Sequence, residues 1–564
     1  SAASDVYKRQ SLFMPLKHRH LKPSIGIRPP IEFFMDVVES HPDLVAMEIK
    51  KEGGWKRWTE AELLKHVKAV SLKLRSLAVG KGDRVGIVGE NSPEWVVAFL
   101  GIFYTGAVAV PLDARLTREE IEHFLNIAET PVVFASSSVE INRDNIPSLR
   151  DIIPLESVME FEGDAMLPSI SLDDELLILF TSGTTGSSKG VVLTNRNVGS
   201  NIDSFLQVLE IYPGDRIFCM LPFHHIFPIT TNILAGITVG ATMTLARSLK
   251  PNELREDLRD SEPQIMTVVP LILEKMVKRI QKEIEKLPAL KRGFVKSLKL
   301  APAGIRKRIF SKVREEMGMG KLRYLVSGGA ALPEFVSSFL EFMGFPILQG
   351  YGLSETSPVV SVNPPEAPRN RSAGLPLPGV EVKIVDPDKD GIGEIAVRGD
   401  LVMKGYYKNP EETKKVITED GWFLTGDMGR FDKDGYLYIT GRKKSVIVTR
   451  GGKNIYPEEI EEKLLESPFI LETLVISREG QLVAVIHPNF DEIRNEIPGM
   501  NEERIKELLR KEVRKINEHL ADYKRIRRIM VVEEELPKTT TQKVKRYIIT
   551  PESIPFERTI KVEE

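Results

Sequence analysis

The chain has 564 residues, of which 42% are hydrophobic and 28% are charged, and its net charge is -2. This length exceeds the size at which one hydrophobic core stops growing, so we expect several domains. The near-zero charge argues against nucleic acid as a partner, because general nucleic-acid binding depends on excess positive charge. The single cysteine, Cys219, excludes an internal disulfide and a cysteine-based zinc site, and fits a reducing compartment such as the cytoplasm.

The N-terminal residues lack the apolar core of a secretory signal. Residues 1–13 differ in composition from the rest of the chain, and we set them aside as disordered or as an artefact, with Met14 as the natural start.

Strands and helices alternate in the first third of the chain. Ser92-Pro93-Glu94 has the composition of a helix start: a capping residue, a proline in the first turn and an acid at the positive end. The pattern predicts strands at 84–89, 107–112 and 131–135, and helices at 92–104 and 118–128. Such alternation is typical of a doubly wound sheet with buried parallel strands.

Residues 226–246 carry no charge and are long enough to span a bilayer. Pro228 and several polar residues dilute the segment, so we expect a buried helix followed by a strand. Residues 383–385 and 393–397 predict antiparallel β structure. After Thr440 the composition changes, and helices at 457–466 and 502–520 with strands at 473–477, 482–486 and 529–532 predict a small α/β domain.

A basic segment covers residues 274–314, with fourteen Lys/Arg against three Glu. Peripheral contact with the anionic inner face of a membrane is the functional interpretation. The pattern favours a solvated helical face instead, because several lysines recur at helical spacing. Attraction of phosphate or coenzyme A is a third interpretation.

Residues 181–191 read Thr-Ser-Gly-Thr-Thr-Gly-Ser-Ser-Lys-Gly-Val, between two apolar runs. Glycines let backbone N–H groups converge, hydroxyls add donors, and Lys189 adds positive charge, which together suit a polyphosphate. The spacing is not that of a Walker A loop, and the flanks predict strands on both sides. A flexible linker is the alternative, although linkers rarely lie between two buried strands.

Further motifs occur in order along the chain. They are Leu221 to His225, Ser327 to Leu332, Gln349 to Thr356, Thr425 to Asp427, Gly441 to Lys444 and Leu536 to Lys543. With the glycine-rich loop, this series resembles the adenylate-forming (AMP-binding) superfamily of acyl-CoA synthetases, coumarate ligases, luciferases and peptide-synthetase adenylation domains. The resemblance extends from about Ile31 to Arg546.

The resemblance implies an α/β fold with a large N-terminal domain of doubly wound sheets plus a β subdomain, and a small mobile C-terminal α/β domain. It implies an N-terminal AMP-binding domain at 14–441, a hinge at 442–444 with Lys444 as its pivot, and the small domain at 445–564. The sequence does not indicate an oligomeric state.

The resemblance also implies the chemistry: ATP converts an acid to an acyl-adenylate, which then reacts with a thiol. A carboxylate is already ionised at neutral pH, so positioning and charge neutralisation are needed rather than a general base. The α-phosphorus undergoes in-line displacement by the carboxylate, and pyrophosphate leaves.

Roles then transfer residue by residue from the family. The phosphates would bind Thr181, Ser182, Gly183, Thr184, Thr185, Gly186 and Lys189, with Ser354 at the α-phosphate. Gly328, Gly329 and Ala330 would border the adenine, on which Tyr351 would stack, and Gly352 would also belong to the nucleotide site. Asp427 would accept the ribose hydroxyls, with Arg442 nearby. Glu355, with Thr184, would hold Mg²⁺. Lys543 would reach the α-phosphate and the attacking carboxylate, and His225 would line the acyl–phosphate junction.

Two positions depart from the family pattern: Gln542 and Pro228 stand where glycine is common. The first would stiffen the loop that presents Lys543, and the second would alter the acyl pocket.

The residues from Asp420 to Lys444, Met403 to Tyr407 and Gly452 to Glu459 resemble fatty acyl-CoA synthetases. A long-chain fatty acid–CoA ligase is therefore the predicted enzyme, with ATP and Mg²⁺ as cofactors and fatty acid and coenzyme A as substrates. The alternatives are a ligase for medium-chain or aromatic acids, a ligase that loads an acyl carrier protein and, more remotely, a non-catalytic nucleotide sensor.

Overall fold

The computed structural model describes residues 21–181, 188–449, 453–497, 499, 501–538, 544–546, 548–553, 555 and 558–562. The predicted phosphate-loop residues Ser182 to Gly186, Gly452 of the motif Gly452 to Glu459, and Gln542 and Lys543 lie outside the described residues, as do residues 1–13.

The first sheet has nine strands within the described residues, in the order β15-β14-β13-β12-β11-β9-β10-β1-β2. From β1 to β13 in this order, neighbouring strands are parallel, and antiparallel strands close both edges. The strands are β1 (Val45–Lys51), β2 (Gly54–Thr59), β9 (Arg216–Cys219), β10 (Thr242–Leu245), β11 (Ile265–Val268), β12 (Tyr324–Ser327), β13 (Ile347–Gly352), β14 (Val359–Val362) and β15 (Leu375–Pro376).

The second sheet has seven strands in the described part of the chain, in the order β18-β8-β7-β4-β3-β5-β6. They are β3 (Arg84–Val88), β4 (Val108–Leu112), β5 (Val132–Ala135), β6 (Asp151–Pro154), β7 (Glu175–Thr181), β8 (Lys189–Thr194) and β18 (Gly405–Tyr406). β3, β4 and β5 are parallel and buried, as the alternating pattern predicts. β7 and β8 pair antiparallel, so the loop between them is strand-flanked, as predicted.

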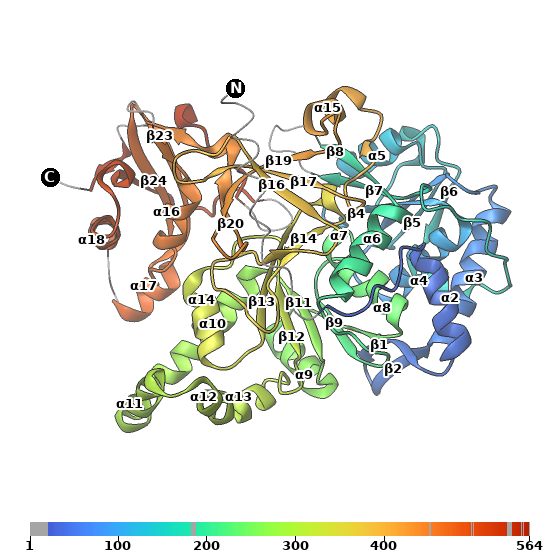
Figure 1. The fold of residues 1–564 in the computed structure, drawn as a ribbon, viewed down its shortest axis with the longest axis horizontal. Helices are drawn as coiled ribbons and strands as arrows, with labels where there is room; N and C mark the ends of the chain where they lie inside the picture. The colour runs from blue at the N-terminus through green and yellow to red at the C-terminus, as the bar shows by residue number, and fades with distance from the viewer. Residues whose placement is uncertain are drawn as a thin grey trace.

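Helices pack around both sheets (Figure 1). The first group is α2 (Pro30–Ser40), α3 (Glu60–Ser76), α4 (Pro93–Thr105), α5 (Arg118–Ala128) and α6 (Asn195–Leu206). Ser92 caps α4 by accepting the backbone N–H of Trp95, and Pro93 follows at the first turn. Nearly every side chain of α4 is buried, which explains why its sequence is apolar all round.

Residues 226–239 form a buried run of short helices, followed by β10, which confirms the prediction for this segment. The run comprises α7 (Ile226–Pro228), the π-helical η3 (Ile229–Leu234) and α8 (Ala235–Val239). No described helix is both long and apolar enough to cross a membrane.

The second group of helices follows β10. It comprises α9 (Pro251–Ser261), α10 (Pro270–Glu285), α11 (Ala289–Ser297), η4 (Leu298–Leu300), α12 (Ala303–Ile309), α13 (Ser311–Glu316) and α14 (Glu334–Phe342). Of this group, α9, α10 and α14 lie beside β11 to β13, whereas α11, α12 and α13 lie along the lower edge of the molecule (Figure 1).

A third, antiparallel sheet has the order β16-β17-β19-β20. Its strands are β16 (Glu381–Val385), β17 (Gly393–Arg398), β19 (Phe423–Phe431) and β20 (Leu437–Arg442), and α15 (Pro410–Val416) precedes β19. The predicted antiparallel structure at 383–385 and 393–397 is thereby confirmed.

The C-terminal part has its own hydrophobic cluster, built from residues 455–562. The short turn η6 (Lys443–Ser445) and the pair β21 (Ile447–Val448) and β22 (Asn454–Ile455) lead into it. Its main elements are α16 (Pro457–Leu464), β23 (Ile470–Arg478), β24 (Gln481–Pro488), α17 (Phe490–Glu496), α18 (Glu502–Asn517), β25 (Ile526–Val531) and β26 (Ile560–Lys561). The predicted α/β composition of this region is correct.

Candidate active site

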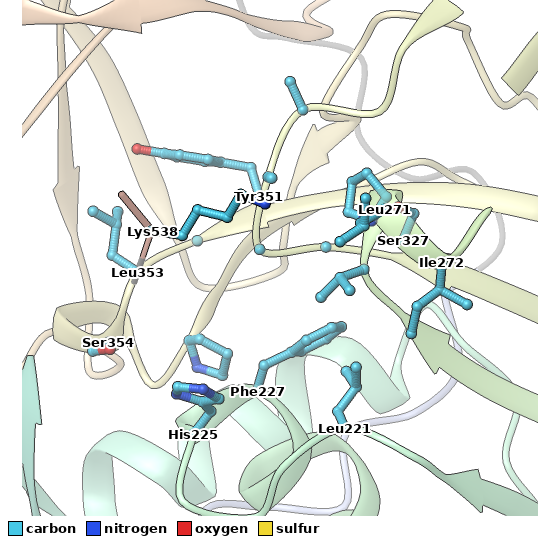
Figure 2. Close-up of a pocket in the computed structure, with 18 of the residues that line it drawn as sticks. Leu221, His225, Phe227, Leu271, Ile272, Ser327, Tyr351, Leu353, Ser354 and Lys538 are labelled. Atoms are coloured by element: carbon cyan, nitrogen blue, oxygen red, sulfur yellow. The ribbon is translucent and has the colours of Figure 1, made fainter. Parts of the chain in front are cut away.

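A continuous cleft of about 2870 Å³ lies at the carboxyl ends of the parallel strands of the first sheet. Residues directly after β9, β11 and β12 line it, together with the end of β13 (Figure 2). In open α/β sheets this edge is where ligands bind, because the loops from several strands converge there. Residues of the second sheet, the third sheet and the C-terminal part complete the walls.

A glycine pair forms one wall of the cleft directly after β12. Gly328 donates its N–H to the Val268 carbonyl at 3.1 Å, and Gly329 has φ +82°, in the left-handed region that favours glycine. A Cβ on Gly328 would lie 3.1 Å from the Phe227 ring. The glycines therefore give the wall a flat backbone surface that continues into Ala330, suited to a planar ligand group.

Tyr351, Asp427 and Arg442 form a hydrogen-bonded chain across the cleft. The Tyr351 hydroxyl donates to Asp427 Oδ2 at 2.7 Å, and Arg442 Nε lies 2.8 Å from Asp427 Oδ1. Asp427 and Arg442 are register partners on β19 and β20, which fixes their proximity. Burial and the Asp427 charge raise the pKa of the Tyr351 phenol, so it remains a donor. These two contacts hold the Asp427 carboxylate in place at the cleft.

Gly352, at the end of β13, is required by close packing. A Cβ at this position would lie 1.7 Å from the Pro358 carbonyl oxygen, so no other residue fits. The backbone then turns into η5 (Ser354–Thr356), which places Ser354 and Glu355 inside the cleft.

Glu355 accepts a hydrogen bond from the Tyr406 hydroxyl at 3.0 Å. Burial raises the pKa of Glu355, while the Tyr406 hydroxyl and the charge of Arg442 oppose that rise. Tyr406 lies on β18, which pairs with β8 at the edge of the second sheet. The hydrogen bond therefore joins the first two sheets at the cleft.

Lys189, at the start of β8, is held by a carboxylate of α15. Its Nζ lies 2.5 Å from Glu412 Oε2 and 4.8 Å from the centre of the Tyr406 ring. Hydrogen bonds from Lys189 and Lys415 lower the pKa of Glu412 to about 2. Thr181, the register partner of Lys189, ends β7 and also lines the cleft. The Lys189 ammonium group thus lies at the C-terminal end of the loop that the sequence predicts to bind phosphates.

His225 lies beside His224, with ring centres 4.1 Å apart, and Figure 2 shows His225 near Phe227. His224 Nε2 is 3.4 Å from Asp113 Oδ2, and Arg115 also binds Asp113. Burial lowers the pKa of His224 to about 4, so its imidazole is neutral at pH 7. Packing against His224 thus fixes the position of His225 at the cleft.

Lysines from the C-terminal part and from the turn η6 that precedes it also line the cleft. Lys444 lines it from η6. Lys538 is drawn in Figure 2 among the lining residues, and its Nζ pairs with Glu472 and, at 2.7 Å, with Glu535. The position of Lys543 relative to these groups is outside the described residues.

One limb of the cleft is apolar and runs between helices α9, α10 and α13. It begins near Phe227, Leu271 and Ile272 (Figure 2). Its walls are mainly aliphatic and thioether side chains, namely Leu254, Leu258, Met276, Ile280, Val313, Met317 and Met319, and the same helices also contribute the charged residues Arg255, Arg279, Glu283 and Glu316. The limb can accept an extended hydrocarbon group whose polar end lies at the cleft.

The described parts of the predicted site come together in this one cleft. Thr181, Lys189, His225, Gly328, Gly329, Ala330, Tyr351, Gly352, Ser354, Glu355, Arg442 and Lys444 line it, and Asp427 is bonded to Tyr351 and Arg442. Their individual roles stay predictions.

Sequence reasoning missed the contacts of Tyr406, Glu412 and Asp113. Tyr406 stands in a motif used only to judge the substrate class, and its hydroxyl contact needs the pairing of two distant strands. Glu412 and Asp113 carried no motif signal.

The residues fit a Mg²⁺ ion that is shared with a polyphosphate. No group of three or more His, Cys, Asp or Glu side chains among the described residues could hold a metal alone. Mg²⁺ is commonly bound by one or two carboxylates plus substrate phosphates, and Glu355 supplies one such carboxylate in the cleft.

Comparison with known proteins also identifies the family of AMP-binding enzymes. The family of AMP-binding enzymes matches residues 34–407, and the C-terminal domain of AMP-binding enzymes matches residues 444–552. The long-chain-fatty-acid–CoA ligase FadD15 of Mycobacterium bovis is 31% identical over 478 residues, covering 77% of this chain and 78% of the relative. The chloroplastic long-chain-fatty-acid–[acyl-carrier-protein] ligase AEE15 of Arabidopsis thaliana is 30% identical over 542 residues, covering 78% and 74%.

Among solved structures, o-succinylbenzoate coenzyme A synthetase (MenE) of Bacillus subtilis, in complex with ATP and a magnesium ion, has a TM-score of 0.73. It is 25% identical, and the match covers 91% of this chain and 98% of that chain.

Proposed function

Because this chain belongs to the family of AMP-binding enzymes, we propose that it is a long-chain fatty acid–CoA ligase. It activates the acid as acyl-AMP with release of pyrophosphate and then transfers the acyl group to coenzyme A. The observation that carries the chain-length part is the apolar limb between α9, α10 and α13, which opens from the polar cleft.

The first step joins a carboxylate oxygen to the α-phosphorus and breaks the bond to pyrophosphate. The carboxylate is ionised at neutral pH, so the residues need to orient it and neutralise charge rather than remove a proton. In this proposal Lys189 and the loop from Thr181 to Gly186 hold the leaving phosphates. Lys543 neutralises charge at the α-phosphate.

The nucleotide is oriented by the opposite wall of the cleft. Gly328, Gly329 and Ala330 border the adenine and Tyr351 packs on it, while Asp427 accepts the ribose hydroxyls. Glu355 contributes a carboxylate to a Mg²⁺ ion, which neutralises phosphate charge when bound. The Tyr406 hydroxyl at 3.0 Å keeps that carboxylate oriented.

In the second step the thiol sulfur attacks the acyl carbon and AMP leaves. His225 lies where the apolar limb meets the polar cleft, which suits contact with the acyl–phosphate junction. Each buried CH₂ contributes about 0.8 kcal/mol, so a limb lined by aliphatic side chains favours long acids over short ones.

Two measurements test the proposal: acid-dependent ATP–pyrophosphate exchange, and acyl-CoA formation with acids from acetate to long-chain fatty acids. We expect kcat/KM to rise with chain length. A maximum at acetate or at an aromatic acid would contradict the long-chain assignment, and absence of exchange with every acid would favour the nucleotide sensor.

The acceptor is tested in the same assay by replacing coenzyme A with holo acyl carrier protein. The similarity to AEE15 makes this the second candidate function. Faster acyl transfer to the carrier protein than to coenzyme A would overturn the proposed acceptor and leave the first half-reaction intact.

A third test removes the charge of Lys543. We expect Lys543→Ala to reduce adenylation by about 10²–10³-fold, the usual effect of losing one donor that stabilises developing charge. Thioester formation from supplied acyl-adenylate should fall much less. Exchange within a few-fold of wild type would show that Lys543 is misassigned.

A further inference from the structure

The chain between α10 and α13 forms a surface that is unlike the rest of the molecule. Residues 286–312 contain η4 and the helices α11 and α12, and neither helix buries a residue. Figure 1 shows α11, α12 and α13 along the lower edge of the molecule, away from the sheets. We call the exposed side chains of residues 286–312 the α11–α12 face.

Large apolar side chains on the α11–α12 face point into solvent. Leu290 is 91% exposed and Leu300 is 92% exposed, and Phe294 and Ile305 are more than half exposed. Leu290 and Phe294 are four residues apart on α11, so they lie on the same side of that helix. Exposed apolar groups gathered on one face mark a site of interaction, because water does not stabilise them.

The charge of the α11–α12 face has a single sign. Residues 286–312 contain nine Lys/Arg and no Asp or Glu. Arg306 lies over the Phe342 ring and donates to the Ala301 carbonyl, so it serves the fold. Lys286 pairs with Glu283 at 2.8 Å. Within the described residues no carboxylate forms an ion pair with the other exposed cations of the face, which are Lys291, Arg292, Lys296, Lys299, Lys307, Arg308 and Lys312.

Apolar and cationic groups together distinguish between the candidate partners. A solvated helical face would carry mixed charges and few exposed Leu or Phe side chains. A soluble phosphate compound would need the cations but not the apolar groups. An anionic bilayer uses both, since basic side chains bind the headgroups while Leu and Phe enter the acyl boundary.

The position of the face relative to the cleft is consistent with a bilayer. Both helices that flank the face in sequence, α10 and α13, also line the apolar limb, through Met276 and Ile280 and through Val313. A sparingly soluble substrate that resides in a bilayer would therefore reach the limb near the docked surface.

We propose that the α11–α12 face docks this protein peripherally onto an anionic lipid bilayer. The cations provide the attraction, and Leu290, Phe294 and Leu300 insert at the level of the headgroups. Such docking is separate from the proposed reaction and does not depend on which acid the enzyme activates.

The test is sedimentation of the full-length protein with lipid vesicles. We compare vesicles of phosphatidylcholine alone with vesicles containing about 30 mol% phosphatidylglycerol, at about 0.1 M and about 1 M NaCl. Wild-type protein should sediment with the anionic vesicles and less with neutral ones, and high salt should weaken the binding.

Two double variants separate the apolar from the electrostatic contribution to vesicle binding. Leu290→Glu with Phe294→Glu removes the apolar contact, and Lys291→Glu with Lys296→Glu reverses two charges. Each should reduce partitioning into anionic vesicles by more than about tenfold, given the contribution of individual basic and apolar groups at a membrane surface.

Control variants carry changes of the same kind elsewhere, one apolar-to-Glu substitution and one double charge reversal. Met166→Glu alters a side chain that is 83% exposed outside the face, and Lys389→Glu with Lys433→Glu reverses two exposed charges in turns of the third sheet. Both controls should bind within about twofold of wild type. Thermal unfolding of every variant identifies any loss of folding, and these measurements need no substrate.

The proposal fails if wild-type protein ignores anionic vesicles, or if both double variants bind as wild type does. It also fails if the face proves to be a protein interface. In that case wild-type protein would be a dimer that Leu290→Glu with Phe294→Glu dissociates, without specific vesicle binding.

Discussion

Glu355 and its partner Tyr406 show how single side chains prepare the cleft. The carboxylate lies where burial favours its neutral form, and the Tyr406 hydroxyl is one of the groups that counter this effect. A hydrogen bond to a charged group is worth about 1.5–3 kcal/mol, so this contact is large enough to affect cation binding.

We therefore expect Tyr406→Phe to raise the Mg²⁺ concentration needed for half-maximal adenylation by roughly tenfold. The phenyl ring keeps the packing, while the hydroxyl contact with Glu355 is lost. Tyr407→Phe is the matched control, because Tyr407 lies next in sequence and its ring faces Lys408 instead. Titration of the exchange rate with Mg²⁺ measures the effect, and equal responses of both variants would contradict the assigned contact.

Asp427 carries a second prediction at this scale. Asp427→Ala should raise the KM for ATP by about 10–100-fold, because charge-assisted bonds to the ribose are removed. Tyr351→Phe keeps both the ring and the carboxylate and removes the 2.7 Å hydrogen bond to Asp427, so its effect should be smaller. Steady-state kinetics with varied ATP distinguish them, and a normal KM in Asp427→Ala would disprove the ribose assignment.

At the scale of an element, α3 combines a favourable start with a buried acid. Thr59 and Glu62 form a reciprocal capping box at its N-terminus. Glu60, the first helical residue, is fully buried, and neither carboxylate oxygen has a hydrogen-bond partner among the described residues. Burial raises the pKa of Glu60 from 4.5 to about 8.

This shift makes stability depend on pH. Between 4.5 and about 8 the folded state holds a proton that the unfolded state releases, so stability should fall as pH rises through this window. Glu60→Gln should remove the slope and add on the order of 3 kcal/mol at pH 7. Chemical denaturation at about pH 5 and about pH 8 measures it, with Glu62→Gln as the exposed control. A slope that Glu60→Gln does not reduce would contradict the prediction.

Elements near the start of the chain follow directly from local sequence. α4 and α5 lie within a residue or so of their predicted bounds, because capping residues and apolar periodicity specify helix ends. β2 and β8 show the limit of this reasoning, since their antiparallel pairing depends on neighbours rather than on their own residues.

The candidate site could be predicted where motifs lie in a fixed order, as for Asp427 and Arg442. Contacts between distant segments could not. Lys189 and Glu412 are 223 residues apart in sequence, and their ion pair forms only because β18 and α15 return to the edge of the second sheet. Such pairs leave no local signal in a single chain.

At the scale of the molecule, the C-terminal part has a hydrophobic cluster of its own, which is separate from the largest cluster of the preceding residues. The cluster of residues 455–562 is distinct from the largest cluster, which residues 31–423 form. η6, which contains Lys444, joins β20 to the C-terminal part and lines the cleft. Separate cores joined by a short turn allow one part to rotate as a unit.

The hinge prediction follows from this arrangement. Lys444→Pro fixes φ near -65° and restricts Lys443, so rotation at this point should be suppressed. We expect the variant to retain substantial ATP–pyrophosphate exchange and to lose most acyl-CoA formation. Lys443→Ala is the control for side-chain loss at the neighbouring position. Loss of both half-reactions would indicate misfolding, and retention of both would place the pivot elsewhere.

Cys219 lies at the end of β9, fully buried, and burial raises the pKa of its thiol to about 12. It is also the single cysteine of the sequence. Thiol reagents should therefore leave the native protein unlabelled. An introduced pair, for example at the exposed Met166 and Leu471, could carry a donor and an acceptor dye without removal of any native cysteine. Single-molecule fluorescence could then follow the two parts of the chain in real time during turnover.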